Sequence, residues 1–487
     1  MSLILALDAG TTSLKGALFE LSGRVLGVCA HEYQLENPEP DIVELDPEVY
    51  WSAAKTVIAN ILQKTAIDPA AIIALGVTGQ GETLIVLDKQ GRPLRKAIVW
   101  LDNRAKAEAE AIRKEFGRDL VYRMTGQQEI VPAWPAAKMV WLREHEPEVF
   151  RSTGKFLMLE DYLIYRLSGT FATDHALNPS TLYYDLRNGC WWERMLDFLR
   201  VSPCQLPILL NSGASAGSVV AETGLSHETA VTVAPIDQVA AAVGAGNIAP
   251  GLVTETTGGA LAVCATVARP VYDPEMRIPI YRHGVPGLFL LMPWIPTAGM
   301  ILRWFRDEFG EGMDYSALDA RAATVSPGCD GLIMLPHFSG MNSPEVNPRA
   351  KGVFWGISTA HRKAHFIRAI LEGVSFALRD NIELLLRSGV ACQEMTSLGG
   401  GARSKLWLQI KADVLQREIR TIHCEEATCL GAAVLAATGR GLFPNIRAAV
   451  NAMVHPSATF HPNIRNKEIY EAGFKTYRAL NQRAFSV

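Results

Sequence analysis

The sequence predicts an α/β protein of two domains, each built on a mixed sheet flanked by helices. Strand and helix patterns alternate along the chain, an order typical of α/β folds. The 487 residues exceed what one hydrophobic core usually serves, and 48% of them are hydrophobic, enough for two cores. A strand, a Gly/Thr turn and a second strand open the chain and recur near residue 250. This echo favours two related domains, at 1–246 and 247–487, although two similar hairpins could coincide.

The composition excludes several classes of protein. The formal net charge is −3 with acids and bases intermixed, so nothing marks a surface for nucleic acid or an anionic membrane. The eight cysteines form no CxxC pair, which argues against a zinc site or a disulfide framework. No apolar run reaches the roughly 18 residues of a membrane span, and Asp8 comes too early for a signal peptide. We expect a soluble, cytoplasmic protein without nucleic-acid or membrane partners.

The turn after the first strand, which covers residues 3–7, is suited to binding phosphate. Gly10 lets the backbone approach an anion. The backbone amides of the next three residues can converge on that anion; they are Thr11, Thr12 and Ser13. Asp8 can hold a magnesium ion directly or through water. The alternative is an ordinary hairpin turn with a polar tip, because short motifs match by accident.

Periodicity and turn residues predict the other elements. Asp46 as N-cap and Pro47 at the first position begin a helix with apolar residues at helical spacing. Turn residues at 88–93 separate the two strands of a hairpin. Further strands are expected from about residue 14 to the turn at 22–24, and at 25–30, 72–77, 84–87, 97–100, 231–233, 251–253, 260–267, 332–335, 394–398 and 419–422. Helices are expected near 103–115, 135–145, 161–167, 239–246, 297–309, 362–387, 403–414 and 426–438.

Asp237 stands where the strand at 231–233 meets the helix at 239–246. An acid at this edge of an α/β sheet points into the ligand crevice and lies near the positive end of the helix. That field is expected to keep the carboxylate ionised, as a base that accepts a hydroxyl proton must be. The alternative is an N-cap aspartate that only starts the helix. The two Gly/Thr turns favour the base, because a bound nucleotide needs an acceptor beside it.

Polar residues after two other buried strands indicate a site for a neutral polyhydroxy ligand. Gln80 and Glu82 follow the strand at 72–77, and Asp102 follows the strand at 97–100. Ligands of α/β folds bind at such strand ends, and acids and amides accept protons from hydroxyl groups. The alternative is a set of loop side chains that face water.

Three glycines, residues 399–401, end the strand at 394–398 before a helix begins. Glycine lets a flat ring or a phosphate lie against the backbone, although such a turn is often only a helix entry. The helix at 426–438 carries small residues at 431–433. We expect close backbone packing of this helix beside a nucleotide site.

Together these motifs resemble the FGGY carbohydrate kinase family, within the actin, hexokinase and Hsp70 superfamily. The similarity runs from Asp8 to about Gly439. One family signature is similar to residues 135–145, and the second is similar to 352–357 followed by 365–372. Two long signatures in the right order, with both phosphate turns, make a chance match very improbable.

The resemblance implies two actin-like (ribonuclease H-like) domains with an active site in the cleft between them, and ATP-dependent phosphorylation of a sugar or polyol hydroxyl. It implies that the N-terminal domain binds the sugar and the C-terminal domain binds the nucleotide. Asp237 matches the catalytic base and Asp8 the aspartate linked to Mg²⁺. Substrate-binding positions are implied for Gln80, Glu82, Asp102, Asp237 and Gln238. Phosphate- and nucleotide-binding positions are implied for Thr11, Thr12, Ser13, Lys15, Thr257, Gly258, Gly400, Gly401 and Ser404.

Departures from the family's patterns leave the substrate open. Residues 80–83 resemble a Gln-Arg-Glu-Thr stretch of glycerol kinases, but Gly81 replaces the arginine. Ala133 stands where glycerol kinases carry a glycerol-contacting tyrosine, and Glu82 stands where xylulokinases carry a histidine. The Trp-x-Asp-x-Arg pattern at 100–104 is xylulokinase-like. We expect a pentulose such as xylulose, with glycerol, a tetritol or another polyol as the alternative.

Three other classes of function stay open. An actin- or chaperone-like ATPase would share both phosphate turns and would need a peptide-binding or filament surface. A sugar sensor without catalysis would bind the same ligand but would not need Asp8 and Asp237. A glycosidase could use paired acids but would not need two phosphate turns. The oligomeric state does not follow from the sequence, and a homodimer is kept open.

Overall fold

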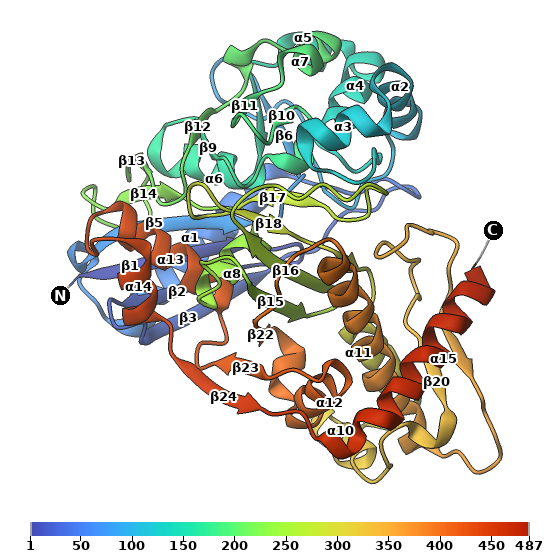
Figure 1. Ribbon diagram of the computed structural model, residues 1–487. Helices are drawn as coiled ribbons and strands as arrows, with labels where there is room; N and C mark the ends of the chain where they lie inside the picture. The colour runs from blue at the N-terminus through green and yellow to red at the C-terminus, as the bar shows by residue number, and fades with distance from the viewer. Residues whose placement is uncertain (1, 486–487) are drawn as a thin grey trace. The chain divides into compact units, whose positions relative to one another are not determined.

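The computed structural model describes residues 2–485, whose elements are labelled in Figure 1. They form two compact units, each made of several stretches of the chain. Unit 1 runs to Ile248 and also contains Ala268–Leu290 and Glu426–His455, whereas unit 2 contains Ala249–Val267, Leu291–Glu425 and the chain from Pro456. The predicted α/β class with mixed sheets is confirmed. The division into functional domains at 1–246 and 247–487 stays a prediction.

Unit 1 is built on a six-stranded mixed sheet in the order β13-β14-β5-β1-β2-β3. The strands are β1 (Leu3–Ala9), β2 (Ser13–Glu20), β3 (Val25–Glu32), β5 (Ile72–Gly79), β13 (Ser215–Ser218) and β14 (Ala230–Val233). Strand β1 is antiparallel to β2 and parallel to β5, which is in turn parallel to β14. The carboxyl ends of β1, β5 and β14 therefore meet at one edge of the sheet.

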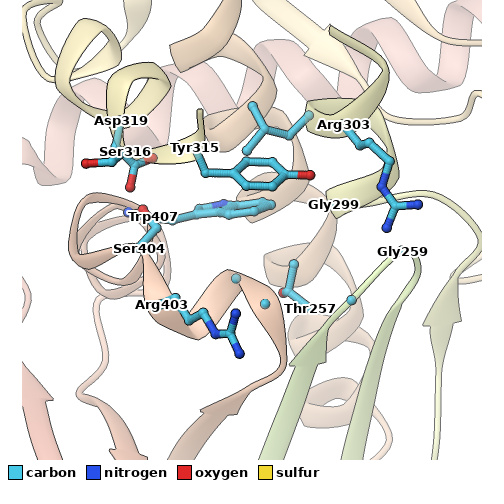
Figure 2. A pocket seen from close by; sticks show the side chains of 14 residues that line it. Thr257, Gly259, Gly299, Arg303, Tyr315, Ser316, Asp319, Arg403, Ser404 and Trp407 are labelled. Atoms are coloured by element: carbon cyan, nitrogen blue, oxygen red, sulfur yellow. Dashed lines mark hydrogen bonds between the residues drawn. The ribbon is translucent and has the colours of Figure 1, made fainter. Parts of the chain in front are cut away.

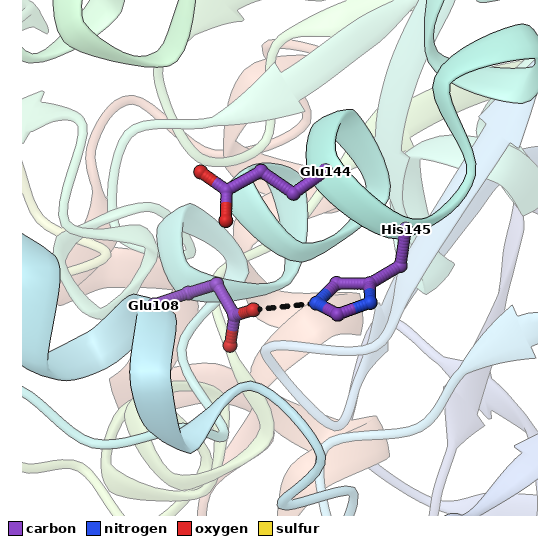
Figure 3. Close-up of side chains that lie close together, drawn as sticks. All are labelled: Glu108, Glu144 and His145. Atoms are coloured by element: carbon purple, nitrogen blue, oxygen red, sulfur yellow. Dashed lines mark hydrogen bonds and ion pairs between the residues drawn. The ribbon is translucent and has the colours of Figure 1, made fainter.

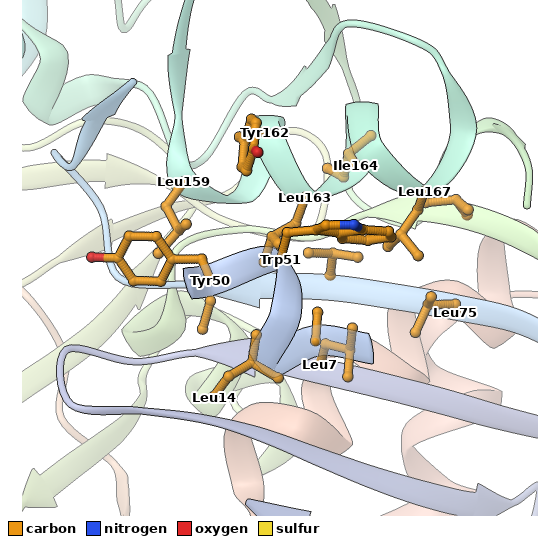
Figure 4. Packing of buried hydrophobic residues seen from close by; sticks show 14 of the residues in the cluster. Leu7, Leu14, Tyr50, Trp51, Leu75, Leu159, Tyr162, Leu163, Ile164 and Leu167 are labelled. Atoms are coloured by element: carbon orange, nitrogen blue, oxygen red, sulfur yellow. The ribbon is translucent and has the colours of Figure 1, made fainter. Parts of the chain in front are cut away.

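Helices α1 (Pro47–Thr65) and α6 (Leu159–Ser168) pack on one face of this sheet. Helix α1 begins where predicted, because the Asp46 carboxylate accepts the Glu48 backbone N–H at 2.9 Å and Pro47 takes the first position. Figure 4 shows Trp51 of α1 beside side chains of α6, in a buried cluster that includes Leu75 of β5. This cluster is the core of unit 1 and holds the strand ends rigidly.

Helix α13 (Ala427–Gly439) covers the opposite face. Neighbouring strand residues point to opposite faces, and beside Leu75 a Cβ added at Gly76 would lie 3.0 Å from the Ala432 carbonyl oxygen. Helix α13 also crosses α8 (Asp237–Gly244) closely, since a Cβ added at Gly431 would lie 1.8 Å from the Ala240 carbonyl oxygen. The predicted close backbone packing of this helix is confirmed, and its partner is the helix that begins at Asp237.

The rest of unit 1 surrounds a small antiparallel sheet in the order β4-β7-β6-β8. Its strands are β4 (Glu44–Leu45), β6 (Leu84–Leu87), β7 (Ala97–Ile98) and β8 (Lys155–Met158). The predicted hairpin is confirmed, with Leu84 opposite Ile98. Around it lie α2 (Lys106–Phe116), α3 (Arg118–Thr125), α4 (Pro135–His145), α5 (Pro147–Ser152), α7 (Glu193–Leu199) and the paired strands β9 (Ala172–Asp174) and β12 (Ile208–Leu210).

The stretch 268–290 returns to unit 1 late in the chain and carries β17 (Ile280–Arg282). Tyr122 of α3 fixes this stretch, because its hydroxyl donates to the Ile278 carbonyl oxygen at 2.9 Å. The same hydroxyl accepts the Asp273 backbone N–H at 3.1 Å. Both contacts join residues about 150 positions apart, which no local pattern announces.

Unit 2 repeats the strand plan of unit 1. Its central strands are β15 (Leu252–Thr257), β16 (Leu261–Val267), β22 (Glu394–Leu398), β23 (Ile419–Ile422) and β24 (Pro456–Phe460). Strand β15 is antiparallel to β16 and parallel to β22, which is parallel to β23. These are the relations of β1 to β2 and β5, and of β5 to β14, so the predicted echo of two related domains is confirmed in the topology.

The helices of unit 2 are α9 (Gly299–Phe309), α10 (Tyr315–Ala322), α11 (Lys363–Arg387), α12 (Lys405–Leu415) and α15 (Lys467–Phe485). A buried network fixes α15 to α11. The Arg368 guanidinium pairs with Glu372 at 2.7 Å and donates to the Tyr470 hydroxyl at 3.0 Å. Within residues 2–485, no helix has both the length and the apolar character needed to cross a bilayer.

Candidate functional site

Three carboxyl groups gather at the edge where β1, β5 and β14 end. Asp8 is the penultimate residue of β1, Glu82 follows β5, and Asp237 is the first residue of α8 after β14. Desolvation raises the pKa of Asp237 to about 8, and the charges of Asp8 and Glu82 add to the effect. Desolvation also raises the pKa of Asp8 to about 6, although the Lys15 ammonium opposes it. The structure thus brings together three carboxyl groups predicted from separate motifs.

The raised pKa of Asp237 disagrees with the expectation that this side chain is an ionised carboxylate. Its carboxylate accepts the Gln238 backbone N–H at 2.6 Å, a contact that favours the charged form. Desolvation and the two neighbouring acids outweigh this contact, so the pKa rises. The expectation that the helix end alone keeps Asp237 ionised is therefore wrong for the protein without ligands. A cation bound nearby would lower this pKa.

Buried amides lie near Glu82. The Gln127 Nε2 has no hydrogen-bond partner among the described residues, and the Gln80 amide interacts only with the Tyr50 hydroxyl. Gln80 is 4% exposed and Gln127 is 2% exposed. Buried polar atoms are normally paired, so unpaired ones indicate a place for ordered water or a ligand. Amides and a carboxylate together can both donate to and accept from a polyhydroxy ligand.

Sequence reasoning missed three residues of this polar group, which are Gln127, Ser180 and Tyr281. The Tyr281 hydroxyl lies 3.5 Å from the Gln127 Oε1. Burial raises the pKa of Tyr281, and the charges of Glu82 and Asp237 add to the effect. Burial raises the pKa of Glu82, and a hydrogen bond from Ser180 opposes it. Tyr281 belongs to the returning stretch 268–290, so no pattern near Glu82 could have indicated it.

The Asp102 carboxylate is occupied by contacts within the protein. One oxygen accepts the Val43 backbone N–H at 2.7 Å and the Arg104 Nη2 at 2.7 Å. The other oxygen accepts the Arg104 backbone N–H at 3.0 Å. The side chain is 0% exposed. These contacts shape the loop at 101–104, and a contact with substrate stays a prediction.

Lys138, to which sequence reasoning gave no chemical role, joins two loops of the site. Its Nζ donates to the carbonyl oxygens of Glu82 at 2.8 Å and Val99 at 2.9 Å. The side chain is 0% exposed. Burial lowers the pKa of Lys138 to about 7, although the charges of Asp102 and Glu82 oppose it. Lys138 therefore fixes the backbone at Glu82 to the end of the strand that precedes Asp102.

The predicted phosphate turn of unit 1 is held by hydrogen bonds within the turn and to neighbouring residues. The Gly10 backbone N–H donates to the Ser13 carbonyl oxygen at 3.0 Å, and the Thr12 carbonyl oxygen accepts the Tyr33 backbone N–H at 3.0 Å. The Trp100 indole N–H donates to the Thr11 hydroxyl at 2.9 Å. These contacts hold the turn against the polar loop at 100–104.

Lys15 lies on β2, opposite Asp8 in the register of β1 and β2. Its Nζ forms an ion pair with Glu426, just before α13, at 3.1 Å. Lys15 is part of this charged group, since its ammonium lowers the pKa of Asp8 while Glu426 raises it. The predicted phosphate-binding residues of unit 1 therefore lie around Asp8.

The predicted nucleotide-binding residues of unit 2 line one cavity of about 540 Å³. The predicted residues in its wall are Thr257, Gly258, Gly400, Gly401 and Ser404. The Ser404 hydroxyl also caps α12, because it accepts the Trp407 backbone N–H at 3.0 Å. The volume is typical of sites for small organic ligands. The glycine turn is thus both a helix entry and part of a pocket.

Other residues of this wall were missed. Figure 2 shows the Tyr315 ring close to the Trp407 indole, with Asp319 on one side and Arg303 on the other. Burial raises the pKa of Asp319, and a hydrogen bond with Ser404 opposes it. Tyr315 and Asp319 belong to α10, a helix that the sequence patterns did not predict. The wall therefore combines aromatic rings, a carboxyl group and a guanidinium.

One further cluster has the composition of a metal site. Figure 3 shows Glu108 of α2 with Glu144 and His145 of α4, whose ligand atoms lie within 4.8 Å of one another. His145 Nε2 lies 3.0 Å from Glu108 Oε1, and Glu144 pairs with Arg143 at 3.1 Å. These two contacts account for the cluster without a metal ion.

Comparisons with known proteins match both halves of the chain. Residues 3–244 match the N-terminal domain of the FGGY family of carbohydrate kinases, and residues 256–439 match its C-terminal domain. A xylulose kinase from Staphylococcus epidermidis is 30% identical over 98% of this chain and 96% of its own length. A glycerol kinase from Trichlorobacter lovleyi is 30% identical over 99% of both chains.

A solved structure agrees with this result. The xylulose kinase from Rhodospirillum rubrum superposes with a TM-score of 0.90 at 30% identity, covering 99% of this chain and 98% of its own. The match includes both repeated sheets and extends over nearly every element of the chain. Together with the two domain matches, it shows that the chain belongs to the FGGY family of carbohydrate kinases.

Proposed function

We propose that this kinase transfers the γ-phosphoryl group of ATP to a hydroxyl of a pentulose, with xylulose as the first candidate. The observation that carries the proposal is the polar group at the ends of β1, β5 and β14. There, three carboxyl groups with raised pKa values lie near the buried amides of Gln80 and Gln127. Such a group suits an acceptor rich in hydroxyls and a base that takes up one of their protons.

The names of the relatives support either a ketose or a polyol as the phosphate acceptor. Relatives of similar identity are named xylulose kinase and glycerol kinase. The Trp-x-Asp-x-Arg pattern at 100–104 favours the first. Glycerol or another short polyol is therefore the second candidate.

ATP is proposed to bind in the cavity of unit 2. A nucleobase can lie against Gly400, where an added Cβ would meet nothing within 4 Å. The turn that follows β15 would face the phosphates, through Thr257 and Gly258. In unit 1, Lys15 and the turn at Thr11, Thr12 and Ser13 would contact the transferred phosphate.

Asp8 is the proposed residue for Mg²⁺. Its Oδ1 is shielded from solvent and has no hydrogen-bond partner within residues 2–485. A carboxylate oxygen is the ligand type that Mg²⁺ prefers. When bound, Mg²⁺ neutralises phosphate charge, and its own charge lowers the pKa of nearby carboxyl groups.

In the proposed reaction, Asp237 accepts the proton of the attacking hydroxyl. Gln80, Glu82 and Gln238 orient the acceptor so that the hydroxyl is in line with the γ-phosphate. Lys138 keeps Glu82 in place by bonding to its carbonyl oxygen. The positive charge of Lys15 stabilises the charge on the transferred group.

The test is an ADP-release screen over pentuloses, pentitols, tetritols, glycerol and aldonates. We expect the highest kcat/KM with a pentulose. Replacing Asp237 by Asn should lower kcat about 10³-fold or more, because it removes the base, and should leave ADP affinity unchanged. ADP release that no acceptor stimulates would favour the ATPase alternative. Sugar phosphorylation by Asp237→Asn at more than about a thousandth of the wild-type rate would contradict the role of Asp237.

A further inference from the structure

A buried charged network lies behind the wall of the unit 2 cavity. Lys411 Nζ lies 2.6 Å from Glu255 Oε1 and 2.8 Å from the Thr257 hydroxyl oxygen. The two charged side chains are both 0% exposed. The Ser397 hydroxyl also donates to Glu255 Oε1. Each group therefore has a partner in a region shielded from bulk solvent.

The network joins three elements of unit 2. Glu255 and Thr257 are alternate residues of β15, so their side chains share one face of the sheet. Ser397 comes from β22, and Lys411 comes from α12. The contacts tie the ends of β15 and β22 to α12 where the two glycine-containing turns begin.

Thr257 is the point where this network meets the cavity, since it lines the wall. Gly401 of the second turn packs directly on it, and a Cβ added at Gly401 would lie 2.7 Å from Thr257 Cβ. Trp407 is a second link between the network and the cavity. Lys411 Nζ lies 5.1 Å from the Trp407 ring centroid, and the Trp407 side chain lines the cavity. A displacement of Thr257 would therefore move both turns of the wall.

The Thr257 hydroxyl has both of its roles filled. It donates to Glu255 Oε2 at 2.7 Å and accepts from Lys411 at 2.8 Å. Its proton is therefore not left for a phosphate oxygen. Any phosphate contact of Thr257 must come from the backbone of the turn, whose position the network determines.

Packing alone does not explain the charges. Taking two ions out of water costs several kcal/mol each, and an apolar pair of similar volume is often as stable. An ion pair with two hydroxyl groups adds direction, because its donors and acceptors are paired with one another in a fixed arrangement. The directed contacts end at Thr257, in the wall of the cavity.

We propose that Lys411 and Glu255 are positioning residues for the phosphates of the nucleotide, acting through Thr257 on the turn at 257–259. The inference rests on the proposed binding of ATP in this cavity. It assigns to the pair an effect on phosphate binding and none on the binding of adenosine.

The test uses the full chain with Glu255→Leu and Lys411→Met together, which removes both charges and nearly keeps the volume. ADP and adenosine affinities are measured by calorimetry and by competition. We expect ADP binding to weaken about tenfold, the effect of losing roughly one oriented hydrogen bond. We expect adenosine affinity to stay within about twofold of the wild type.

A matched control is Arg368→Met with Glu372→Leu, at the other buried pair of unit 2. Neither control residue lines the cavity, so ADP and adenosine affinities should both stay unchanged. Should the first double variant fail to fold, Thr257→Val keeps the ion pair, removes the hydroxyl and should weaken ADP binding selectively.

The outcomes separate the two proposals. A wild-type protein that binds no ADP would overturn nucleotide binding in this cavity, and the inference with it. If the wild type binds ADP, equal ADP affinity in the variant overturns the inference alone. A parallel loss of ADP and adenosine affinity also overturns it, because a merely structural role would weaken both.

Discussion

Desolvation dominates the ionisation of the carboxyl groups inside unit 1. It raises the pKa of Asp8 to about 6 and that of Asp237 to about 8. Burial raises the pKa of Asp161 and of Asp174 to about 7. For Asp237 a high pKa makes a stronger base, but a protonated Asp237 cannot accept the proton of a hydroxyl. The proposed Mg²⁺ at Asp8 would lower the pKa of Asp237 and so resolve this conflict.

Asp174 has no proposed role in the reaction. The effect of its desolvation on the free energy of unfolding can therefore be measured separately from catalysis. In the folded chain this carboxyl keeps its proton up to about pH 7, whereas in the unfolded chain it ionises above about pH 4. Its contribution to stability is complete below about pH 4 and is lost as the pH rises through about 7.

Asp174→Asn should therefore change the pH dependence of stability. Asparagine cannot ionise and keeps an oxygen for the Ala176 backbone N–H, which Asp174 accepts at 2.7 Å. We expect equal stability of variant and wild type near pH 4 and a gain of about 4 kcal/mol for the variant at pH 8. Urea denaturation followed by tryptophan fluorescence measures both. A constant difference at all pH values would contradict the account.

At the scale of elements, loops that carry polar site residues are held by side chains from helices. Lys138 of α4 donates hydrogen bonds to the carbonyl oxygens of Glu82 and Val99, which lie in two different loops. A lysine can serve several acceptors because its ammonium has three donors. Without these bonds, the backbone at Glu82 would lose its fixed distance from the loop at 100–104.

Lys138→Met should therefore affect acceptor binding more than nucleotide binding. Methionine keeps the apolar stem but leaves two buried carbonyl oxygens unpaired. We expect KM for the sugar to rise about tenfold or more, with the affinity for ADP unchanged.

Steady-state kinetics with the best acceptor, together with ADP calorimetry, would measure both quantities. Lys155→Met is the matched control, because Lys155 also bonds two carbonyl oxygens, those of Cys204 and Leu206, at 2.8 and 3.1 Å. Should the KM for the sugar stay at the wild-type value, Lys138 would be a packing residue only.

Elements with strong local patterns could be predicted from the sequence. Strands β1 and β2 and helix α1 follow from apolar runs, a turn and an N-cap. Helix α15 was missed although its buried residues, Tyr470, Phe474 and Tyr477, have helical spacing. This spacing is visible in the sequence, but the elements predicted from motifs end at residue 438.

Other parts of the candidate site could not be predicted, since they depend on contacts between distant residues. Tyr281 reaches Gln127 across 154 positions. Lys411 reaches Glu255 across 156 positions. Residue type and spacing indicate which side chains can do chemistry, but which of them meet depends on the packing of the whole chain.

At the scale of the whole molecule, unit 1 needs residues from the second half of the chain. Helix α13 covers the face of β1 and β5 at Gly76 and crosses α8 through Gly431. The returning stretch 268–290 satisfies the Tyr122 hydroxyl. A chain that ends at residue 246 lacks both, so it would expose an apolar sheet face and leave buried polar groups unpaired.

We therefore expect residues 1–246, produced alone, not to fold cooperatively. The fragment should bind a hydrophobic dye and show no sharp thermal transition, because the sheet face that α13 normally covers is exposed to water. Production together with residues 247–487 should restore the transition, since that fragment supplies 268–290 and α13. Amide exchange in β5 of the full chain is the reference. A lone fragment 1–246 that protects those amides as well would mean that the six-stranded sheet and α1 suffice, and that the later segments only add to a domain that is already stable.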